Sequence, residues 1–339
     1  MIGEYPPKIG GISTHIYQLK KELNKLGQDV FVLTYSNATE EKVYSTKLPK
    51  KFRGFFFIFF GIFKGIIIIR KNKIDLIHSH FATTPGLLGY FLSILSGKKR
   101  ILTVHGSDVN VYLQKGSIGR LVKFVLSKYQ VIVAVSPNLQ KKLTDFLERE
   151  VISIPNGVDH SIFSPEKSEK NGIGFIGALV NEKNPRDFIE LIRELRKKGI
   201  VEPAYMIGEG YLRKELEDIS QGLNIIFLGE IIDAEKYLKK FKAVVSTSKT
   251  EGFGLSILEA MACGIPVVSL VSPGSSYLLD NLTLTVKEKN QLVDLVEKII
   301  LNQKFRTELS NKVLEKSKLF SWEKSAIATL EVYQRILFE

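Results

Sequence analysis

The chain contains few of the residues that would mark a secreted or disulfide-stabilised protein. Its 339 residues include a single cysteine, Cys263, which excludes an internal disulfide and gives no support for an oxidising compartment. The opening segment, MIGEYPPKIGG, lacks the basic-then-apolar pattern of a secretory leader. These absences predict a cytoplasmic protein.

Metal-binding patterns are also scarce. No Asp-x-Asp sequence occurs, which weighs against Mg²⁺ or Mn²⁺ bridging a bound diphosphate. His78 and His80 form an H-x-H pair on an expected strand, but no third ligand lies at a spacing that suits zinc. The sequence therefore predicts no metal site and no cofactor.

Acidic residues are scarce in the first half of the chain. Residues 1–165 carry 23 Lys and Arg but 11 Asp and Glu, whereas residues 166–339 carry 25 of each, so the net charge of +12 belongs to the first half. Such a surplus favours nucleic acid, an anionic membrane surface or an acidic substrate as partner. Zinc-finger, helix-turn-helix and RNA-module patterns are missing, so no nucleic-acid partner is expected.

One apolar run lies in this basic half. Residues 55–69 read FFFIFFGIFKGIIII, and basic residues flank them on both sides: Lys47, Lys50, Lys51, Arg53, Arg70, Lys71 and Lys73. The run carries an internal charge, Lys64, and is shorter than the roughly 20 apolar residues that span a bilayer. Three interpretations stay open: an apolar core helix, a helix in the interface of an anionic membrane, and a true span. The second would make the protein peripheral on the inner face of the membrane.

Strand-like and helix-like patterns alternate along the chain. Short apolar segments typical of strands occupy residues 29–35, 74–80, 100–104, 130–135, 150–154, 172–179, 204–207, 225–228, 243–246 and 266–270. Stretches of helical length separate them, which predicts an α/β protein with parallel, doubly wound sheets. Residues 156–170 are polar and turn-rich, so we expect two Rossmann-like domains, 1–165 and 166–339, with ligands at the carboxyl ends of strands facing a shared cleft.

A glycine-rich segment at residues 172–177, GIGFIG, matches the G-x-G-x-x-G pattern of dinucleotide-binding proteins. That fingerprint must follow a strand and open a helix. Here the glycines lie within the expected strand, and the next helix begins only near Pro185. The context therefore argues against a nicotinamide-dependent oxidoreductase.

The most informative segment is EGFGLSILEAMACGIPVV, residues 251–268. Gly252 and Gly254 keep Glu251 on a loop, and the expected helix begins near Leu255. A helix N-terminus approached by glycines binds a diphosphate through free N–H groups and the helix dipole. Glu259, about one turn further, can accept two hydrogen bonds from a ribose diol, and Glu251 stays near the sugar end. The alternative is a surface glutamate followed by a buried helix.

Three further positions fit the same chemistry. Gly10 and Gly11 open the first expected helix and let the backbone approach phosphate, although a plain helix start reads the same way. His105 follows a strand in TVHGSD, where its imidazole can hydrogen-bond a sugar hydroxyl. Lys183, in NEKNP after a strand, is the best candidate cation for a diphosphate.

The ordered set of motifs resembles glycosyltransferase family 4, a group of retaining enzymes with the GT-B fold. The segments that carry the resemblance are GGISTHIYQLKKELNKLGQDV, DLIHSH, TVHGSD, VISIPNGVDHSIF, GALVNEK, IGEGYLRKEL, FLGE, the 251–268 segment and FSWEKSA. The last marks a closing helix that in this fold crosses back to the N-terminal domain.

The resemblance implies a retaining transfer from a nucleotide-sugar, either a UDP- or a GDP-sugar, to a glycan or lipid-linked acceptor without a metal. It implies catalytic roles for Glu251 and His105, beside the transferred sugar. Donor contacts fall to Gly10, Gly11, Lys183, Gly252, Phe253, Gly254, Leu255 and Glu259, and His15 and Asp108 lie on the acceptor side. Such enzymes act in polysaccharide or glycolipid biosynthesis.

Two departures from the family pattern bear on activity. The family has an Arg after the glycine of the GALVNEK segment, where this chain has Ala178, so Arg186 or Lys249 must substitute for it or activity is low. The family's first strand, before EYPP, is reduced to Met1, Ile2 and Gly3. A non-catalytic nucleotide- or glycan-binding relative therefore stays open as an alternative. A sugar-nucleotide epimerase of related two-domain architecture stays open as a second.

Overall fold

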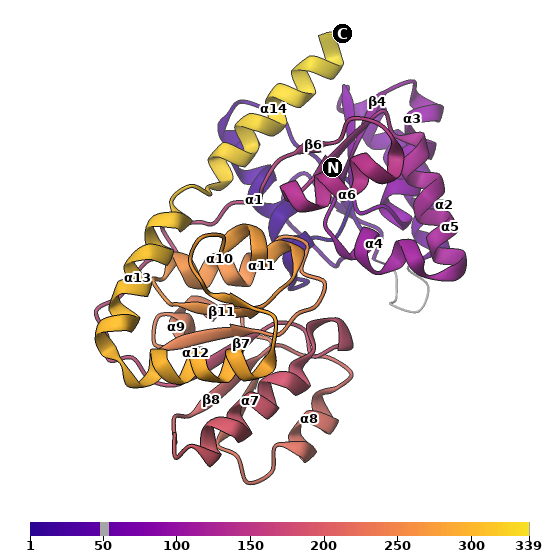
Figure 1. The fold of residues 1–339 in the computed structure, drawn as a ribbon. Coiled ribbons are helices and arrows are strands. Elements are labelled where there is room, and N and C mark those ends of the chain that lie inside the picture. The colour runs from indigo at the N-terminus through magenta and orange to yellow at the C-terminus, as the bar shows by residue number, and fades with distance from the viewer. Residues whose placement is uncertain (48–53, 339) are drawn as a thin grey trace. The chain divides into compact units, whose positions relative to one another are not determined.

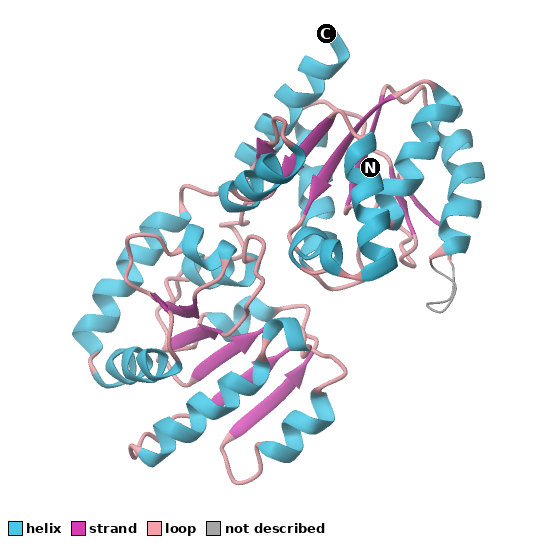
Figure 2. Ribbon diagram, turned by 45° about the vertical axis from the view of Figure 1, so that its right-hand side comes forward, coloured by secondary structure: helices cyan, strands magenta, loops and turns pink. Residues whose placement is uncertain are grey.

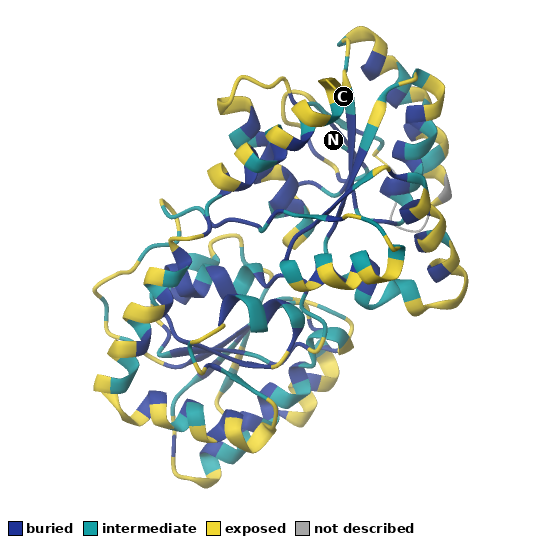
Figure 3. Ribbon diagram, turned by 45° about the horizontal axis from the view of Figure 1, so that its top comes forward, coloured by how far each residue is buried: buried dark blue, intermediate teal, exposed yellow. Residues whose placement is uncertain are grey.

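The structure, a computed structural model, describes residues 1–47 and 54–338. The chain divides into two compact units, of which unit 1 comprises Met1–Asn156 and Trp322–Glu339 and unit 2 comprises Gly157–Ser321. The sequence placed this boundary at residue 165. Helices flank a parallel sheet in each unit, and the central strands are mostly buried while the outer helix faces are exposed (Figures 1, 2 and 3).

The strands of unit 1 run in parallel. They are β1 (Val32–Thr34), β2 (Val43–Ser45), β3 (Leu76–His80), β4 (Lys99–Val104), β5 (Val131–Ala134) and β6 (Ile152–Ser153). The order β3-β4-β5-β6 forms one sheet and β1-β2 a separate pair. Ile2 links the two because it bridges both Leu33 and Ser79. Residues 1–3 thus lie between β1 and β3.

The helices of unit 1 connect these strands. They are α1 (Gly11–Lys25), α2 (Phe55–Lys71), α3 (Thr84–Ser96), α4 (Ser107–Asn110), the 3-10 turn η2 (Tyr112–Gln114), α5 (Gly116–Lys128), α6 (Pro137–Leu147) and α14 (Trp322–Phe338). Helix α1 buries Ile16, Leu19 and Leu23 at helical spacing. Helix α14 packs beside α1, so the last helix returns to unit 1 as the GT-B resemblance implied (Figure 1).

Unit 2 contains one six-stranded parallel sheet in the order β12-β11-β10-β7-β8-β9. Its strands are β7 (Ile173–Ile176), β8 (Ala204–Ile207), β9 (Ile225–Gly229), β10 (Ala243–Ser246), β11 (Val267–Leu270) and β12 (Thr285–Val286). The other elements are the 3-10 turn η3 (Asn181–Lys183), α7 (Pro185–Lys197), α8 (Arg213–Ile219), α9 (Ala234–Leu238), α10 (Leu255–Ala262), α11 (Pro273–Leu278), α12 (Lys289–Leu301) and α13 (Gln303–Ser317). Cys263 is buried after α10, and burial raises the pKa of its thiol to about 12.

The expected α/β architecture is confirmed, and each of the ten expected strands contains a strand of the structure. The glycines of the GIGFIG segment lie on or beside β7. A Cβ at Gly174 would approach the Phe241 ring to 2.4 Å, so this glycine serves packing. Two short edge strands, β2 and β12, were not expected from the sequence. Each carries only two or three residues, too few for an alternating pattern.

Helix α2 has two different faces. Phe57, Ile68 and Ile69 are buried, and the helix packs closely on α3 because Gly61 and Gly65 lie against Leu88 and Leu92; a Cβ at either glycine would come within 2.6 Å of a leucine methyl. The opposite face is exposed: Phe56, Phe59, Phe60, Phe63 and Ile67. The core-helix interpretation therefore accounts for one face only. Lys50, Lys51 and Arg53 lie outside the described residues.

The described helices include none that combines the length and the apolar character needed to cross a bilayer.

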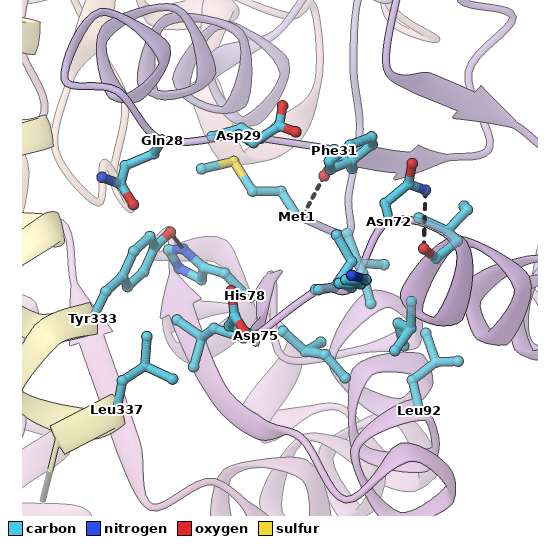
Figure 4. Close-up of a pocket in the computed structure, with 18 of the residues that line it drawn as sticks. Met1, Gln28, Asp29, Phe31, Asn72, Asp75, His78, Leu92, Tyr333 and Leu337 are labelled. Atoms are coloured by element: carbon cyan, nitrogen blue, oxygen red, sulfur yellow. Dashed lines mark hydrogen bonds between the residues drawn. The ribbon is translucent and has the colours of Figure 1, made fainter.

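A cavity of about 440 Å³ opens beside the start of the chain in unit 1 (Figure 4). Phe31, Ile69, Leu76 and Tyr333 are among the residues that line it. The amino group of Met1 is buried here and donates to Phe31 O at 2.6 Å, and burial lowers its pKa to about 5. Residues 1–3 thus lie between β1 and β3, and Met1 and Ile2 line one side of the cavity.

Candidate active site

The loop that follows β10 in unit 2 brings two of the expected site residues together. The ammonium of Lys183, at the end of η3, forms an ion pair with the Glu251 carboxylate. Both side chains are mostly buried, which strengthens the pairing relative to one in open solvent. The two residues lie 68 positions apart in sequence, so the fold alone makes them neighbours.

The two loops are held together by further hydrogen bonds. Thr247 Oγ1 donates to Lys183 O and Asn184 O, at 3.1 and 2.8 Å. Ser248 Oγ reaches Glu182 O at 3.3 Å, and the Lys249 amide donates to the same carbonyl at 3.4 Å. The η3 turn and the 247–249 segment therefore form one cationic loop pair around Lys183. Among the described residues the Lys249 ammonium has no acidic partner.

Helix α10 begins where the sequence predicted, at Leu255, directly after this loop. Gly254 adopts φ +98°, a left-handed conformation that favours glycine, and no described side chain caps the helix. Its first-turn amides are therefore available to a ligand. The loop itself packs closely against Gly274. The Gly274 amide donates to Glu251 O at 2.8 Å, and a Cβ at Gly274 would strike the Phe253 backbone. Phe253 is buried against Phe320, so its side chain is a packing group here.

Glu259 lies just over one turn into α10. Desolvation by burial, with a smaller contribution from Glu235, raises the pKa of its carboxyl to about 8. No described residue donates a hydrogen bond to this carboxyl, which is half-buried. A carboxylate held in such a position without donors costs free energy, and a ligand with two adjacent hydroxyl groups would relieve that cost.

Ala178, which replaces the family's Arg, is exposed next to the cationic loops. A Cβ at the preceding Gly177 would lie 3.7 Å from the Lys183 side chain, so Ala178 directly follows a residue that adjoins Lys183. Of the two substitutes, Arg186 is already paired: its guanidinium bonds both Glu215 oxygens and Asn181 Oδ1. Lys249 is the better candidate.

In unit 1 the glycine pair starts α1 as expected. Gly10 precedes the helix, Gly11 is its first residue, and both are exposed. A Cβ at Gly10 would meet nothing within 4 Å, and no described side chain caps the helix. The start of α1 is thus uncapped and open around Gly10, which suits the approach of an anionic group.

His15 and His105 also lie together in unit 1, with ring centroids 4.7 Å apart in an edge-to-face arrangement. His15 Nδ1 donates to Asn156 Oδ1 at 2.7 Å, and the edge of Trp322 covers its ring. Burial lowers the pKa of His15 to about 4 and that of His105 well below its usual range. Both imidazoles are therefore neutral at pH 7 and can accept or donate one hydrogen bond each.

Asp108 is fully buried and holds the His105 loop. Its carboxylate accepts hydrogen bonds from the amides of Ala82, His105 and Gly106 at 2.9 to 3.4 Å. Burial raises its pKa to about 6 against the opposing effect of these amides. In this structure the Asp108 side chain positions the loop. Its expected place on the acceptor side concerns contact with a ligand and stays a prediction.

The H-x-H pair on β3 divides into two kinds of histidine. His78 is satisfied, since Nδ1 and Nε2 hydrogen-bond Tyr333 and Thr103 at 2.6 and 2.7 Å. His80 is fully buried, and neither of its ring nitrogens has a partner among the described residues. The sequence found no third ligand for this pair by spacing, whereas the fold brings His15 and His105 to His80.

Sequence reasoning missed Asn156 and Trp322 as neighbours of His15. Asn156 is the first residue of the stretch interpreted as a linker, and Trp322 was noted only as part of a terminal helix. Neither carries a local signal, because each meets His15 through the return of the chain to unit 1. A family alignment is the kind of signal that could have marked them.

Two protein-family models match the chain in succession. The model described as Glycosyltransferase Family 4 matches residues 9–162, and that described as Glycosyl transferases group 1 matches residues 159–316.

Similar proteins span most of the chain. An uncharacterized glycosyltransferase of Methanocaldococcus jannaschii is 31% identical, over 98% of this chain and 96% of the relative. The alpha-monoglucosyldiacylglycerol synthase of Streptococcus pneumoniae is 25% identical, over 82% and 71% of the two chains. The gpi3 subunit of the phosphatidylinositol N-acetylglucosaminyltransferase of Schizosaccharomyces pombe is 26% identical, over 98% and 79%.

Solved structures share the architecture. The sucrose-phosphate synthase of Thermosynechococcus elongatus superposes with a TM-score of 0.83 at 19% identity, covering 96% of this chain and 94% of that one. Anabaena HepE in complex with UDP and glucose gives 0.82 at 16% identity, covering 98% of each. These likenesses show that the fold is GT-B.

Proposed function

The chain belongs to the group 1 glycosyltransferases of family 4, and from this membership we propose that it moves a sugar from a UDP- or GDP-sugar to a glycan or lipid-linked acceptor, with retention of configuration and without a metal ion. Anabaena HepE, with UDP and glucose bound, supports a nucleotide-sugar donor.

The observation that carries the donor proposal is the Glu259 carboxyl. It is half-buried and without an internal donor, one turn beyond a helix start whose amides are uncapped. A nucleotide-sugar supplies the matching groups: a ribose diol for Glu259 and a diphosphate for the α10 amides and the Lys183 loop. The ion pair of Lys183 with Glu251 then opens when the diphosphate takes the ammonium.

The proposed transfer step uses these groups as follows. The bond between the anomeric carbon and the donor phosphate oxygen breaks, and the acceptor hydroxyl oxygen bonds the same face of that carbon. The acceptor proton passes to the departing phosphate oxygen, so no strong protein base is needed. Lys183, Lys249 and the α10 amides stabilise the charge on the leaving diphosphate. Glu251 positions the sugar through its hydroxyl groups. The corresponding role of neutral His105 rests on the family resemblance.

A lipid-linked acceptor is favoured over a free glycan by the exposed face of α2. Its phenylalanines contact one another, with Phe59–Phe60 and Phe59–Phe63 centroids 5.4 and 5.2 Å apart, and Arg70, Lys71 and Lys73 are exposed at the end of the helix. Apolar aromatics beside cations fit the interface of an anionic bilayer. Two of the relatives, an alpha-monoglucosyldiacylglycerol synthase and a phosphatidylinositol N-acetylglucosaminyltransferase subunit, support the same acceptor class. We propose that this docking holds the protein on the inner, cytoplasmic face of a membrane.

The donor proposal is tested by nucleotide binding and turnover. UDP- and GDP-sugars are screened by thermal shift, and the best donor is then followed in a transfer assay. Wild type should bind at least one of them, and Glu259→Ala should weaken that binding about 10-fold or more because two hydrogen bonds to the ribose diol are lost. The control Glu308→Gln alters an exposed carboxylate of α13 and should change nothing. Absence of binding at millimolar nucleotide-sugar would refute the proposal.

The membrane docking is tested by co-sedimentation with phosphatidylglycerol vesicles. Replacing Phe59 and Phe63 by Ser should reduce binding several-fold, and so should replacing Arg70 and Lys71 by Ser at low salt. Phe146→Ser, at an exposed aromatic of α6, is the matched control. Equal sedimentation of all variants would exclude α2 as the docking element.

A further inference from the structure

Three histidines of unit 1 converge from three separate elements. His15 lies in the second turn of α1, His80 ends β3, and His105 follows β4. One ring nitrogen from each lies within 4.8 Å of the other two. The rings of His15 and His80 are 5.1 Å apart, and those of His80 and His105 5.7 Å apart.

The nitrogens that converge have nothing to bond within the protein. His15 Nε2, His105 Nε2 and both nitrogens of His80 are buried without a partner among the described residues. Buried polar atoms of this kind are rare and costly, so their gathering at one point indicates a ligand. Because each neutral imidazole can turn one lone pair toward this point, the cluster suits a ligand that supplies positive charge.

The tautomer of the neutral His15 ring is fixed by its neighbour Asn156. Asn156 Oδ1 can only accept a hydrogen bond, so His15 Nδ1 carries the hydrogen and Nε2 presents its lone pair to the cluster. An oxygen acceptor on the far nitrogen is the arrangement that orients a metal-bound imidazole. Asn156 is itself buried, which holds this orientation. His78 takes no part, since Tyr333 and Thr103 occupy both of its nitrogens.

We propose that His15, His80 and His105 form a binding site for Zn²⁺. Neutral imidazole is a preferred zinc ligand, and three histidines leave a fourth position for water. Zinc–nitrogen bonds of about 2.0–2.1 Å require ligand atoms roughly 3.4 Å apart. The site contracts by side-chain rotation of about 1.4 Å at most from its present spacing.

Zinc at this cluster takes the Nε2 lone pair of His105. Transfer then stops, because His105 no longer reaches the sugar hydroxyl; this second statement rests on the proposed function. The cation is thus an inhibitor of the reaction and not its cofactor.

Binding is tested independently of activity. The purified full chain is treated with EDTA, dialysed, and titrated with ZnCl₂ against a chromophoric zinc indicator, with thermal unfolding recorded in parallel. We expect one Zn²⁺ per chain and a higher unfolding temperature at saturation. Co²⁺ should give the intense visible absorption of a tetrahedral site.

Two variants identify the ligands. His80→Asn should abolish the stoichiometric binding, and Asn156→Ala, which leaves all three ligands in place, should weaken it about 10- to 100-fold. The control His160→Asn removes the histidine of unit 2, which bonds Phe320 O, and should bind zinc like wild type. If His80→Asn does not fold, the Asn156→Ala result decides. Zinc binding below one per chain, or equal binding by wild type and the folded variants, would overturn the proposal.

The inhibition is tested last, with the donor found above. Zinc should suppress transfer by wild type and leave transfer by His80→Asn unaffected. A chain that binds zinc but shows no transfer refutes the proposed function and not the site. A chain that transfers sugar and binds no zinc refutes the site alone.

Discussion

At the scale of single residues, Glu259 joins the ribose-binding role proposed above to a cost in the stability of the folded state. Its folded pKa of about 8 lies above the ordinary value of 4.5, so the native state holds the proton more tightly than the unfolded chain does. The stability that this proton provides is present below pH 4.5 and is lost as the pH rises through about 8.

Glu259→Gln removes this pH dependence. The variant should be more stable than wild type, by a margin that grows between pH 4.5 and 8 to on the order of 4 kcal/mol, and should bind its nucleotide-sugar about 10- to 100-fold more weakly. Urea unfolding at several pH values and calorimetric titration measure the two effects. A pH-independent difference would show that the carboxyl is solvated in the free protein.

Ala178 is the second residue where a single change is informative. Ala178→Arg places a cation beside Lys183 and should raise the transfer rate about 10-fold or more, since one preorganised donor near a leaving group contributes about 3 kcal/mol. If Lys249 now fills that role, Lys249→Ala should cost more in wild type than in Ala178→Arg. Arg186→Ala is the control, because its pairing with Glu215 keeps it away from the phosphates. Additive effects in this cycle would show that Lys249 is not the substitute.

The sequence predicted those candidate site residues that a short local pattern marks. Glu251, Gly254 and Glu259 follow from a glycine loop that opens a helix, and Lys183 from its place after a strand. It could not predict that Lys183 pairs with Glu251, nor that His80 joins His15 and His105, because these contacts span loops of tens of residues. The same limit applies to Asn156, which became informative only through the hydrogen bond to His15.

At the scale of elements, hydrophobic periodicity predicted which segments form strands and which form helices. It did not predict which face of α2 is buried, and only the structure shows this. An apolar run without polar positions has no periodic signal to separate a buried face from an exposed one. The glycines at positions 61 and 65 mark the packed face, since both lie against α3. The exposed face of α2 is the opposite side, which carries Phe59 and Phe63.

The prediction at the scale of elements concerns residues 1–3, between β1 and β3, and the stability of unit 1. Adding four residues before Met1, with apolar side chains alternating as in a strand, should raise the unfolding temperature of unit 1 by a few degrees. The added backbone would replace the buried amino group with paired amides, and its side chains would enter the cavity of about 440 Å³ (Figure 4). An extension of four Asp residues should give no gain. Equal unfolding temperatures for both extensions would show that the cavity does not accept a strand.

At the scale of the whole molecule, two units with their own cores should respond separately to a donor. Trp322, the single tryptophan, lies in unit 1, so its fluorescence reports the unfolding of that unit. A nucleotide-sugar at 100 times its Kd should stabilise unit 2 by about 2.7 kcal/mol. Far-UV circular dichroism records the unfolding of both units, so its unit 2 transition should move while the fluorescence transition of unit 1 stays in place. The expected shift is roughly 5–10 °C. A matching shift of the tryptophan signal would mean that the two units unfold as one.

The buried thiol of Cys263 has a practical consequence. A thiol reacts as its thiolate, and a pKa of about 12 behind a covering of side chains leaves almost none of that form at neutral pH. Toward maleimide reagents the native protein should therefore behave as though it had no cysteine. A cysteine introduced at an exposed position of each unit could carry a pair of dyes or spin labels without altering Cys263, and energy transfer between the two would follow the units through a catalytic cycle.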